Sequence, residues 1–203
     1  MTDEISYPLV EVFESLQGEG RNAGRPCVFI RFAGCNLGCP WCDTLRERRF
    51  SATLEELVAE AKGFRARSVV LTGGEPAVQR GMPELVAALK REGFWIAVET
   101  NGTKSPDWFA FVDYVACSPK AEYAALYDAP DALASADEVR VVASVPETAA
   151  FCRFIRGRIA ATDYYVSPCD RGGEIDFAAA KAALAGLEGW SLSVQLHKLL
   201  GFR

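Results

Sequence analysis

One stretch decides the fold of this chain: Arg31-Phe-Ala-Gly-Cys35-Asn-Leu-Gly-Cys39-Pro-Trp-Cys42-Asp43-Thr44. It holds three cysteines within eight residues, with the spacing C-x3-C-x2-C. The run Val28-Phe-Ile-Arg-Phe32 is β-branched and aromatic, which predicts a buried strand. The cysteines therefore lie on the loop that leaves the carboxyl end of this strand, where α/β proteins usually place their chemistry.

Three thiolates this close together can bind one inorganic centre, and their number narrows the choice. Structural zinc normally takes four ligands, and ordinary iron–sulfur clusters take four cysteines. Three cysteines leave one iron of a [4Fe–4S] cube open to a small molecule. The spacing resembles the signature of the radical S-adenosylmethionine (SAM) superfamily. The resemblance implies that Cys35, Cys39 and Cys42 hold the cluster, that SAM binds the open iron, and that Trp41 lies near the adenine.

Two interpretations without SAM stay open at this point. A zinc knuckle could be completed by Cys27 or Cys169, or the cysteines could form a disulfide framework. Neither interpretation needs the further motifs described below. Cys27, Cys117 and Cys152 lie among apolar residues, which is typical of inert core cysteines.

The composition predicts one globular domain. The chain has 203 residues, of which 50% are hydrophobic and 24% charged, so it can bury a sizeable core. The net charge of −5 predicts neither a nucleic-acid nor an anionic-membrane partner. The start, Met1-Thr-Asp-Glu4, is acidic where a secretory signal would be basic, and no apolar run is long enough to span a bilayer. Seven cysteines without such a signal indicate a reducing cytoplasm.

Strand and helix patterns alternate along the chain. Strands are expected near residues 9–13, 28–32, 68–72, 94–99, 114–118, 138–143, 164–167 and 192–196. Helices are expected after the capping box Thr53/Glu56, after Pro83, around 106–111, after the cap Ser144/Glu147 and after Asp176. Strands separated by helices imply a parallel sheet with right-handed crossovers. A full eight-fold barrel typically needs about 250 residues, so we expect an α/β fold of the partial (βα)6-barrel kind, with abbreviated helices, as in radical SAM cores.

Polar residues stand where the predicted strands end. Gly73-Gly74-Glu75-Pro76 resembles the superfamily's GGE motif, in which Gly74 and Glu75 would hold the amino group of SAM. Glycine suits such a position because a side chain would block close backbone approach to a ligand. Ser118-Pro119-Lys120 and Ser167-Pro168-Cys169-Asp170 end later strands. By sequence alone each of the three segments is an ordinary turn. The residues expected to contact SAM are Trp41, Cys42, Asp43, Gly74, Glu75, Ser118, Pro119, Lys120, Ser167, Pro168, Cys169 and Asp170.

Five further segments indicate which family of the superfamily the chain resembles. They are Leu16-Gln-Gly-Glu-Gly20, Gly24-Arg-Pro26, Cys42-Asp43-Thr44, Glu99-Thr-Asn-Gly102 and His197-Lys-Leu-Leu-Gly201. Together they make the chain similar to the 7-carboxy-7-deazaguanine synthases, radical SAM enzymes of queuosine biosynthesis. The resemblance runs from about Glu11 to the last residue. One departure is Ser167-Pro168, where the family often has glutamine before the proline.

The resemblance implies a reaction and its residues. The substrate would be 6-carboxy-5,6,7,8-tetrahydropterin, and radical ring contraction with loss of ammonia would give 7-carboxy-7-deazaguanine. Glu99 and His197 are the expected groups for hydrogen bonding or proton transfer, and Thr44 matches the position that ligates Mg2+. The expected substrate contacts are Leu16, Gln17, Gly18, Arg31 (to the substrate carboxylate), Thr72, Glu99, His197 and the terminal carboxylate of Arg203.

Each of these residues also has an ordinary interpretation. Arg31 could form a structural ion pair, Thr44 could be a loop residue, and Glu99 could cap a turn. His197, the only histidine, could be a surface or core residue. It is their coincidence across one chain that favours the family.

Two other functions are weighed against this one. A radical SAM activase of a glycyl-radical enzyme would have the same cluster loop but no pterin pocket. A non-catalytic zinc or iron–sulfur protein would have four cysteine ligands and no SAM cleavage. The resemblance further implies a flavodoxin or ferredoxin reductant and a homodimer. It also implies that residues 1–203 form one domain, with a short N-terminal substrate-binding segment and a C-terminal tail that closes the pocket.

Overall fold

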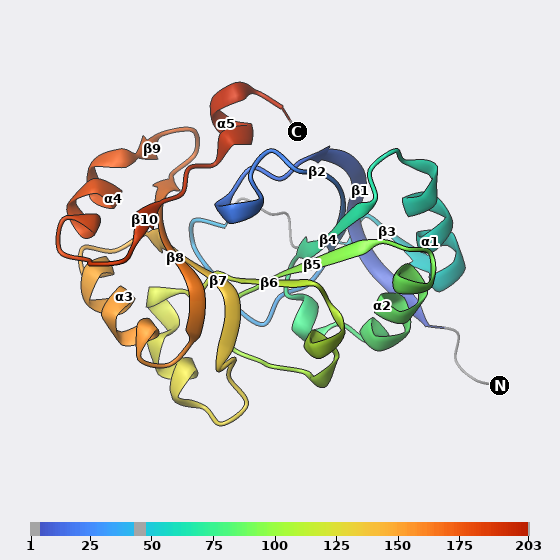
Figure 1. The fold of residues 1–203 in the computed structure, drawn as a ribbon, viewed down its shortest axis with the longest axis horizontal. Helices are drawn as coiled ribbons and strands as arrows, with labels where there is room; N and C mark the ends of the chain where they lie inside the picture. Colours follow the sequence, from blue (N-terminus) through green and yellow to red (C-terminus); the bar gives the residue numbers. More distant parts are fainter. Residues whose placement is uncertain (1–4, 43–47, 203) are drawn as a thin grey trace.

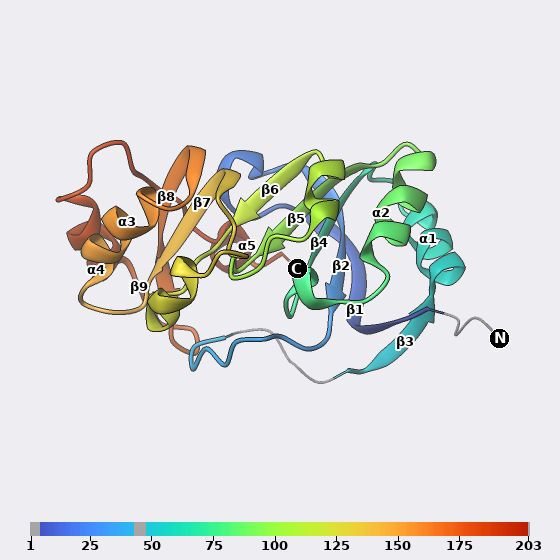
Figure 2. The same cartoon turned by 90° about the horizontal axis from the view of Figure 1, so that it is seen from below.

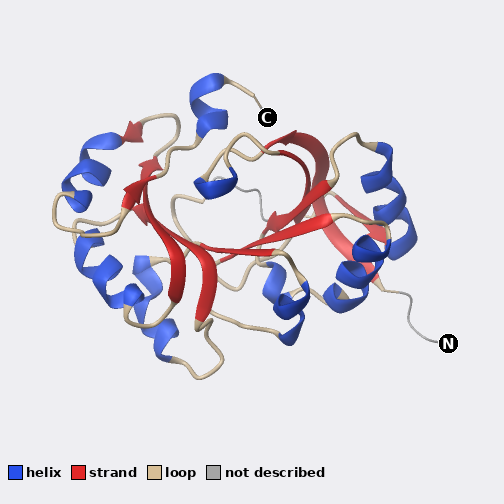
Figure 3. Cartoon of the chain, in the orientation of Figure 1, coloured by secondary structure: helices blue, strands red, loops and turns tan. Residues whose placement is uncertain are grey.

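The computed structural model describes residues 5–42 and 48–202, which form one curved sheet with most of the helices on its outer side (Figures 1 and 3). The strands are β1 (Ser6–Leu16), β2 (Pro26–Phe32), β3 (Phe50–Thr53), β4 (Ser68–Gly73), β5 (Trp95–Thr100), β6 (Tyr114–Cys117), β7 (Ser135–Ala143), β8 (Ala160–Asp170), β9 (Ile175–Asp176) and β10 (Ser191–Leu192). The α-helices are α1 (Leu54–Gly63), α2 (Met82–Arg91), α3 (Thr148–Arg156), α4 (Phe177–Leu184) and α5 (Leu196–Leu200). Short 3-10 helices are η1 (Gly20–Asn22), η2 (Pro76–Val78), η3 (Asp107–Phe111) and η4 (Ala121–Asp128).

The sheet order is β10-β8-β7-β6-β5-β4-β2-β1-β3, with β9 paired to β8. The strands from β2 through β4, β5, β6, β7 and β8 to β10 are parallel, and they include the six of the predicted barrel. β1 and β3 add antiparallel strands to one edge. The partial α/β barrel is confirmed, but the sheet is mixed where a wholly parallel one was expected. The reason is that β1 reaches β2 through a short connection, and antiparallel pairing suits such a connection.

Local signals account for most element starts. Thr53 and Glu56 form the predicted capping box, and Asp176 caps α4 by accepting a hydrogen bond from the Ala179 N–H. The predicted cap at Ser144 is wrong, because α3 begins at Thr148 after Glu147, whose side chain makes no capping bond. The helix expected around 106–111 is the short 3-10 helix η3 (Asp107–Phe111), and most of the strand expected at 192–196 is absent.

The core lies between the outer face of the sheet and the helices. Val28, Ile30 and Phe32 of β2 face this core together with Val139 and Val141 of β7. Because side chains alternate along a strand, the residues between them face the hollow of the sheet. The same alternation turns Arg31, Thr72, Glu99 and Arg140 inward.

The segment after β2 crosses the open side of the sheet toward β8 (Figure 2). It carries the three cysteines and follows the carboxyl end of its strand, as predicted. In the described residues no helix has the length and apolarity that crossing a membrane requires.

Candidate active site

Two adjoining cavities open at the carboxyl ends of the parallel strands. The first has a volume of about 1110 Å³ and the second about 1350 Å³, both counted with their open mouths. The residues that line both cavities are Glu19, Thr72, Glu99, Arg140, Gln195 and Lys198.

The first cavity gathers the cysteines and most of the predicted SAM contacts. Its lining includes Cys35, Cys39, Trp41, Cys42, Gly74, Glu75, Ser118, Lys120, Ser167, Pro168 and Asp170. Pro119 and Cys169 lie between these residues but do not line the cavity, and the side chain of Cys169 is buried. Asp43 lies outside the described residues. The Ser167 hydroxyl is buried and has no hydrogen-bond partner among the described residues, so it is a polar group that a ligand could satisfy.

The cysteine loop is held by η4 and by the turn after β5. Trp41 donates its indole N–H to Glu122 at 2.7 Å, and the Lys120 ammonium lies 5.1 Å from the centre of the indole ring. At the other end of the loop, Asn101 donates to Asn36 at 2.9 Å. These contacts fix the loop on both sides of the cysteines.

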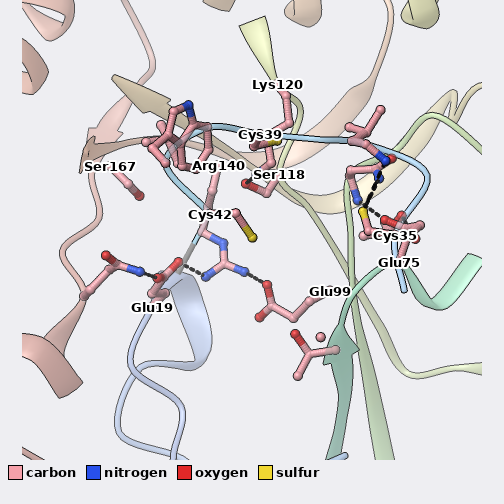
Figure 4. Close-up of a pocket in the computed structure, with 18 of the residues that line it drawn as sticks. Glu19, Cys35, Cys39, Cys42, Glu75, Glu99, Ser118, Lys120, Arg140 and Ser167 are labelled. Atoms are coloured by element: carbon pink, nitrogen blue, oxygen red, sulfur yellow. Dashed lines mark hydrogen bonds and ion pairs between the residues drawn. The ribbon is translucent and has the colours of Figure 1, made fainter. Parts of the chain in front are cut away.

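The chemistry of the donor set fits a three-cysteine cluster, but the three thiols do not converge on one point in the described residues. Cys35, Cys39 and Cys42 face one cavity, and thiolates are the ligands that iron–sulfur clusters take. Burial raises the pKa of Cys39, and the nearby Cys42 and Cys35 raise it further. Among residues 5–42 and 48–202, no three His, Cys, Asp or Glu side chains are close enough together to hold a metal ion. Figure 4 accordingly shows Cys35 on the Glu75 side of the cavity, away from Cys42.

Glu75 ties neighbouring strand ends together. Its carboxylate accepts hydrogen bonds from the Ala77 N–H at 2.9 Å, the Thr100 hydroxyl at 2.7 Å and the Asn101 N–H at 2.7 Å. Burial raises the pKa of Glu75, and these donors lower it in part. The Gly74 N–H donates to the Phe32 carbonyl at 2.8 Å. The motif therefore joins β2, β4 and β5 beside the cysteine loop, and its contact with SAM stays a prediction.

The second cavity gathers the predicted substrate contacts. Its lining includes Leu16, Gln17, Gly18, Arg31, Thr72, Glu99 and His197. Arg31 pairs through its Nε with Glu11 at 2.8 Å, so the ion pair of its ordinary interpretation is present as well. Thr44 and Arg203 lie outside the described residues.

α5 brings the only histidine to the Gln17-Gly18 segment. The Leu196 N–H donates to the Gly18 carbonyl at 2.9 Å. A Cβ at position 18 would collide with the His197 imidazole, so glycine is what lets the ring approach the backbone there. Gln195 donates to Glu19 at 2.6 Å, and Lys198 pairs with Asp170 at 2.8 Å. The C-terminal segment therefore borders both cavities.

Among the lining residues that the sequence reasoning did not assign to the site are Glu19, Asn101, Arg140, Gln195 and Lys198. Glu19 stands inside the Leu16–Gly20 motif and could have been added to it. Arg140 carried a usable signal, since Glu138 and Arg140 alternate with Val139 and Val141 in a strand. That pattern predicts charged groups facing the hollow of a barrel. Nothing in the sequence singled out Gln195.

Comparison with known proteins gives concordant results. The profile of the Radical SAM superfamily matches residues 29–116. The 7-carboxy-7-deazaguanine synthase of Haemophilus influenzae is 38% identical, over 98% of this chain and 95% of its own. That of Neisseria meningitidis serogroup B is 41% identical, over 96% and 93% respectively. The crystal structure of QueE from Escherichia coli matches with a TM-score of 0.73 at 25% identity, over 95% of each chain.

Proposed function

Because this chain belongs to the 7-carboxy-7-deazaguanine synthase family of radical SAM enzymes, we propose that it converts 6-carboxy-5,6,7,8-tetrahydropterin into 7-carboxy-7-deazaguanine with loss of ammonia. One observation carries the proposal. Most of the residues expected to bind SAM line the first cavity, and all the described residues expected to bind the pterin line the second. Thr72 and Glu99 line both, so ligands in the two cavities would meet beside them.

The superfamily implies a [4Fe–4S] cluster and SAM, which supply when bound the one-electron chemistry that removes and returns a hydrogen atom of the substrate. Cys35, Cys39 and Cys42 would hold the cluster. Trp41, fixed by Glu122, offers a flat apolar face to the adenine. The charged ends of Lys120 and Asp170 lie along the same cavity and suit the polar groups of SAM.

The charged residues of the second cavity would bind the pterin substrate. The planar guanidinium of Arg31 suits the substrate carboxylate better than an ammonium would. We propose that Mg2+, held in part by Thr44, shares this carboxylate, because Mg2+ prefers oxygen ligands. Glu99 would accept hydrogen bonds from the ring, and His197 would close the pocket over Gly18 together with the carboxylate of Arg203.

The test uses anaerobically reconstituted protein with SAM, dithionite, Mg2+ and 6-carboxytetrahydropterin, and mass spectrometry of the products. We expect 7-carboxy-7-deazaguanine from the wild type and from the matched control Cys152→Ala, whose cysteine lies in the apolar core. Cys39→Ala should give none. SAM cleavage to 5′-deoxyadenosine without that product would contradict the proposed substrate. An intact cluster without SAM cleavage would contradict the radical SAM reaction itself. Omitting Mg2+ tests the metal separately.

We further propose a flavodoxin or ferredoxin as the reductant, a homodimer, one domain over residues 1–203, and the cytoplasm as the location. The family supports the first two, and the single continuous sheet supports the third. Size-exclusion chromatography with light scattering tests the dimer, and replacing dithionite by reduced flavodoxin tests the reductant. Nothing in the described residues favours the glycyl-radical activase.

A further inference from the structure

Arg140 on β7 is a buried cation that faces three carboxylates. Its side chain is 2% exposed. Its Nη1 lies 2.6 Å from Glu19 and its Nη2 pairs with Glu99. Its Nε lies 2.9 Å from Glu138 but makes no hydrogen bond to any described residue. Figure 4 shows the guanidinium pointing between Glu19 and Glu99. These partners come from the segment after β1, from β5 and from β7, so one side chain joins three parts of the site.

The chemistry of this position requires an arginine. A guanidinium presents five N–H donors in a fixed plane, whereas an ammonium presents three donors from a single point. The planar group donates to Glu19 and Glu99 from two different nitrogens while its third edge faces Glu138. A buried cation without partners is strongly destabilising, and so is a buried carboxylate that loses its cation.

Glu99, like Glu19, lines both cavities. Its Oε1 accepts a hydrogen bond from the Gln17 amide at 2.8 Å, and its Oε2 accepts one from Arg140. Both oxygens therefore accept hydrogen bonds from neighbouring side chains, which favours the ionised form, whereas burial raises the pKa of Glu99. Each carboxylate oxygen has two lone pairs, so each keeps one for a ligand. Glu99 is thus an oriented acceptor at the junction of the two cavities.

The charge state of Glu99 depends on a balance among its neighbours. Burial raises the pKa of Glu99, Arg140 lowers it, and Glu19 and Glu138 raise it. The other polar groups around it are Gln17 before Glu19, Thr72 on β4, Tyr114 on β6, which donates to Glu138, and Gln195 and Lys198 of the C-terminal segment. Three carboxylates face one buried guanidinium, and among the neighbours Arg140 is the one that most favours the ionised form of Glu99.

We propose that Arg140 is a positioning residue that keeps Glu99 ionised and aimed at the substrate ring where the two cavities meet. Its catalytic consequence rests on the proposed function, because a pterin offers the ring N–H donors that an ionised Glu99 would accept. Arg140 itself acts through Glu99 and through Glu19.

The direct test follows the Glu99 carboxyl by NMR in protein labelled with 13C at the glutamate side-chain carboxyl, with the cluster in its oxidised state. The Glu99→Gln spectrum identifies the signal. Arg140→Met should raise the pKa of Glu99 by about 1–3 units, the shift that an opposite charge at this distance supports. Glu138→Gln removes a like charge and should lower the pKa of Glu99. This second variant, with an expected shift in the opposite direction, decides the question if Arg140→Met folds poorly. Arg158→Met, whose arginine pairs with Asp128 at the surface, is the matched control and should change nothing.

The kinetic test measures kcat/KM against pH for the same proteins. The acidic limb of the profile should move with the NMR pKa, upward for Arg140→Met and downward for Glu138→Gln, whereas a merely structural role lowers the rate equally at every pH. An unchanged Glu99 titration in both variants would overturn the proposal. A shifted titration with an unshifted kinetic limb would overturn the positioning role. Wild-type protein that forms no product would instead refute the proposed function, while the NMR titration still decides the link between Arg140 and Glu99.

Discussion

Replacing Gly74 by alanine is the change whose consequence the structure determines most directly. A Cβ at position 74 would overlap the carbonyl group of Gly34, inside the 3.0 Å that real Cβ contacts keep. The obstacle is backbone, so no side-chain rotation relieves it, and the segment of Gly34 and Cys35 must move by at least about 1 Å. That movement breaks the bonds from the Gly74 N–H to the Phe32 carbonyl (2.8 Å) and from the Glu75 N–H to the Gly34 carbonyl (2.9 Å).

The expected magnitude of the Gly74→Ala effect follows from these contacts. Two lost hydrogen bonds of about 1 kcal/mol each and overpacking of about 1–3 kcal/mol lower the free energy of unfolding by about 3–5 kcal/mol. For a chain of this length, Tm should fall by about 6–20 °C. Because Gly34 directly precedes the first predicted cluster ligand, iron bound after anaerobic reconstitution should fall as well.

The matched control is Gly63→Ala. Gly63 ends α1, and an added Cβ there meets no atom within 4 Å. Alanine in a helix stabilises by about 0.5–1 kcal/mol relative to glycine, so Tm should rise by about 1–4 °C. Thermal melts followed by circular dichroism and assays of iron and sulfide per chain measure both effects. A Gly74→Ala protein that melts and binds iron like Gly63→Ala would refute the reasoning.

Three further substitutions probe other parts of the site and core. Gly18→Ala pushes the His197 ring away, so we expect KM for the pterin to rise about 5-fold, from about 1 kcal/mol of lost binding; an unchanged KM would contradict the packing. Glu122→Gln weakens the hydrogen bond to Trp41 and should raise KM for SAM about 5-fold, with KM for the pterin as the internal control. Burial raises the pKa of Tyr7 to about 12, so its contribution to stability is complete below the unfolded pKa of about 10 and is lost as pH rises to about 12. Tyr7→Phe should therefore reduce the loss of stability between pH 10 and 12 by about 3 kcal/mol, and parallel denaturant-midpoint curves for the two proteins would argue against this.

Local patterns predicted the elements best where the signal was itself local. The capping box Thr53/Glu56 and the Asp176 cap are formed as expected, because each is a contact between residues three apart. The Ser144 cap failed although its spacing to Glu147 is the same. The chain after β7 first makes a turn in which the Ser144 N–H donates to the Val142 carbonyl at 2.8 Å, and α3 starts only beyond it. Tertiary placement of the turn overrode the capping pattern.

Strand pairing was harder to predict than strand position. The residues of β1 were recognised as a strand, but their antiparallel pairing with β2 was not, and β3 was missed because Phe50–Thr53 is too short to show alternation. Direction and edge pairing depend on where distant segments meet. A period of two residues along one strand carries no information about that.

The sequence by itself determined the cysteine loop, the parallel strands that carry it, and the family whose site residues those strands present. These are properties of spacing and alternation, which act between neighbours in the chain. Only the tertiary structure decided that Arg140 stands between Glu19, Glu99 and Glu138, and that Gln195 and Lys198 return to border both cavities. Arg140 and its three carboxylate neighbours are up to 121 positions apart in the sequence. Their contact depends on the register of parallel strands and on the path of the C-terminal segment, and both are set by packing of the whole sheet.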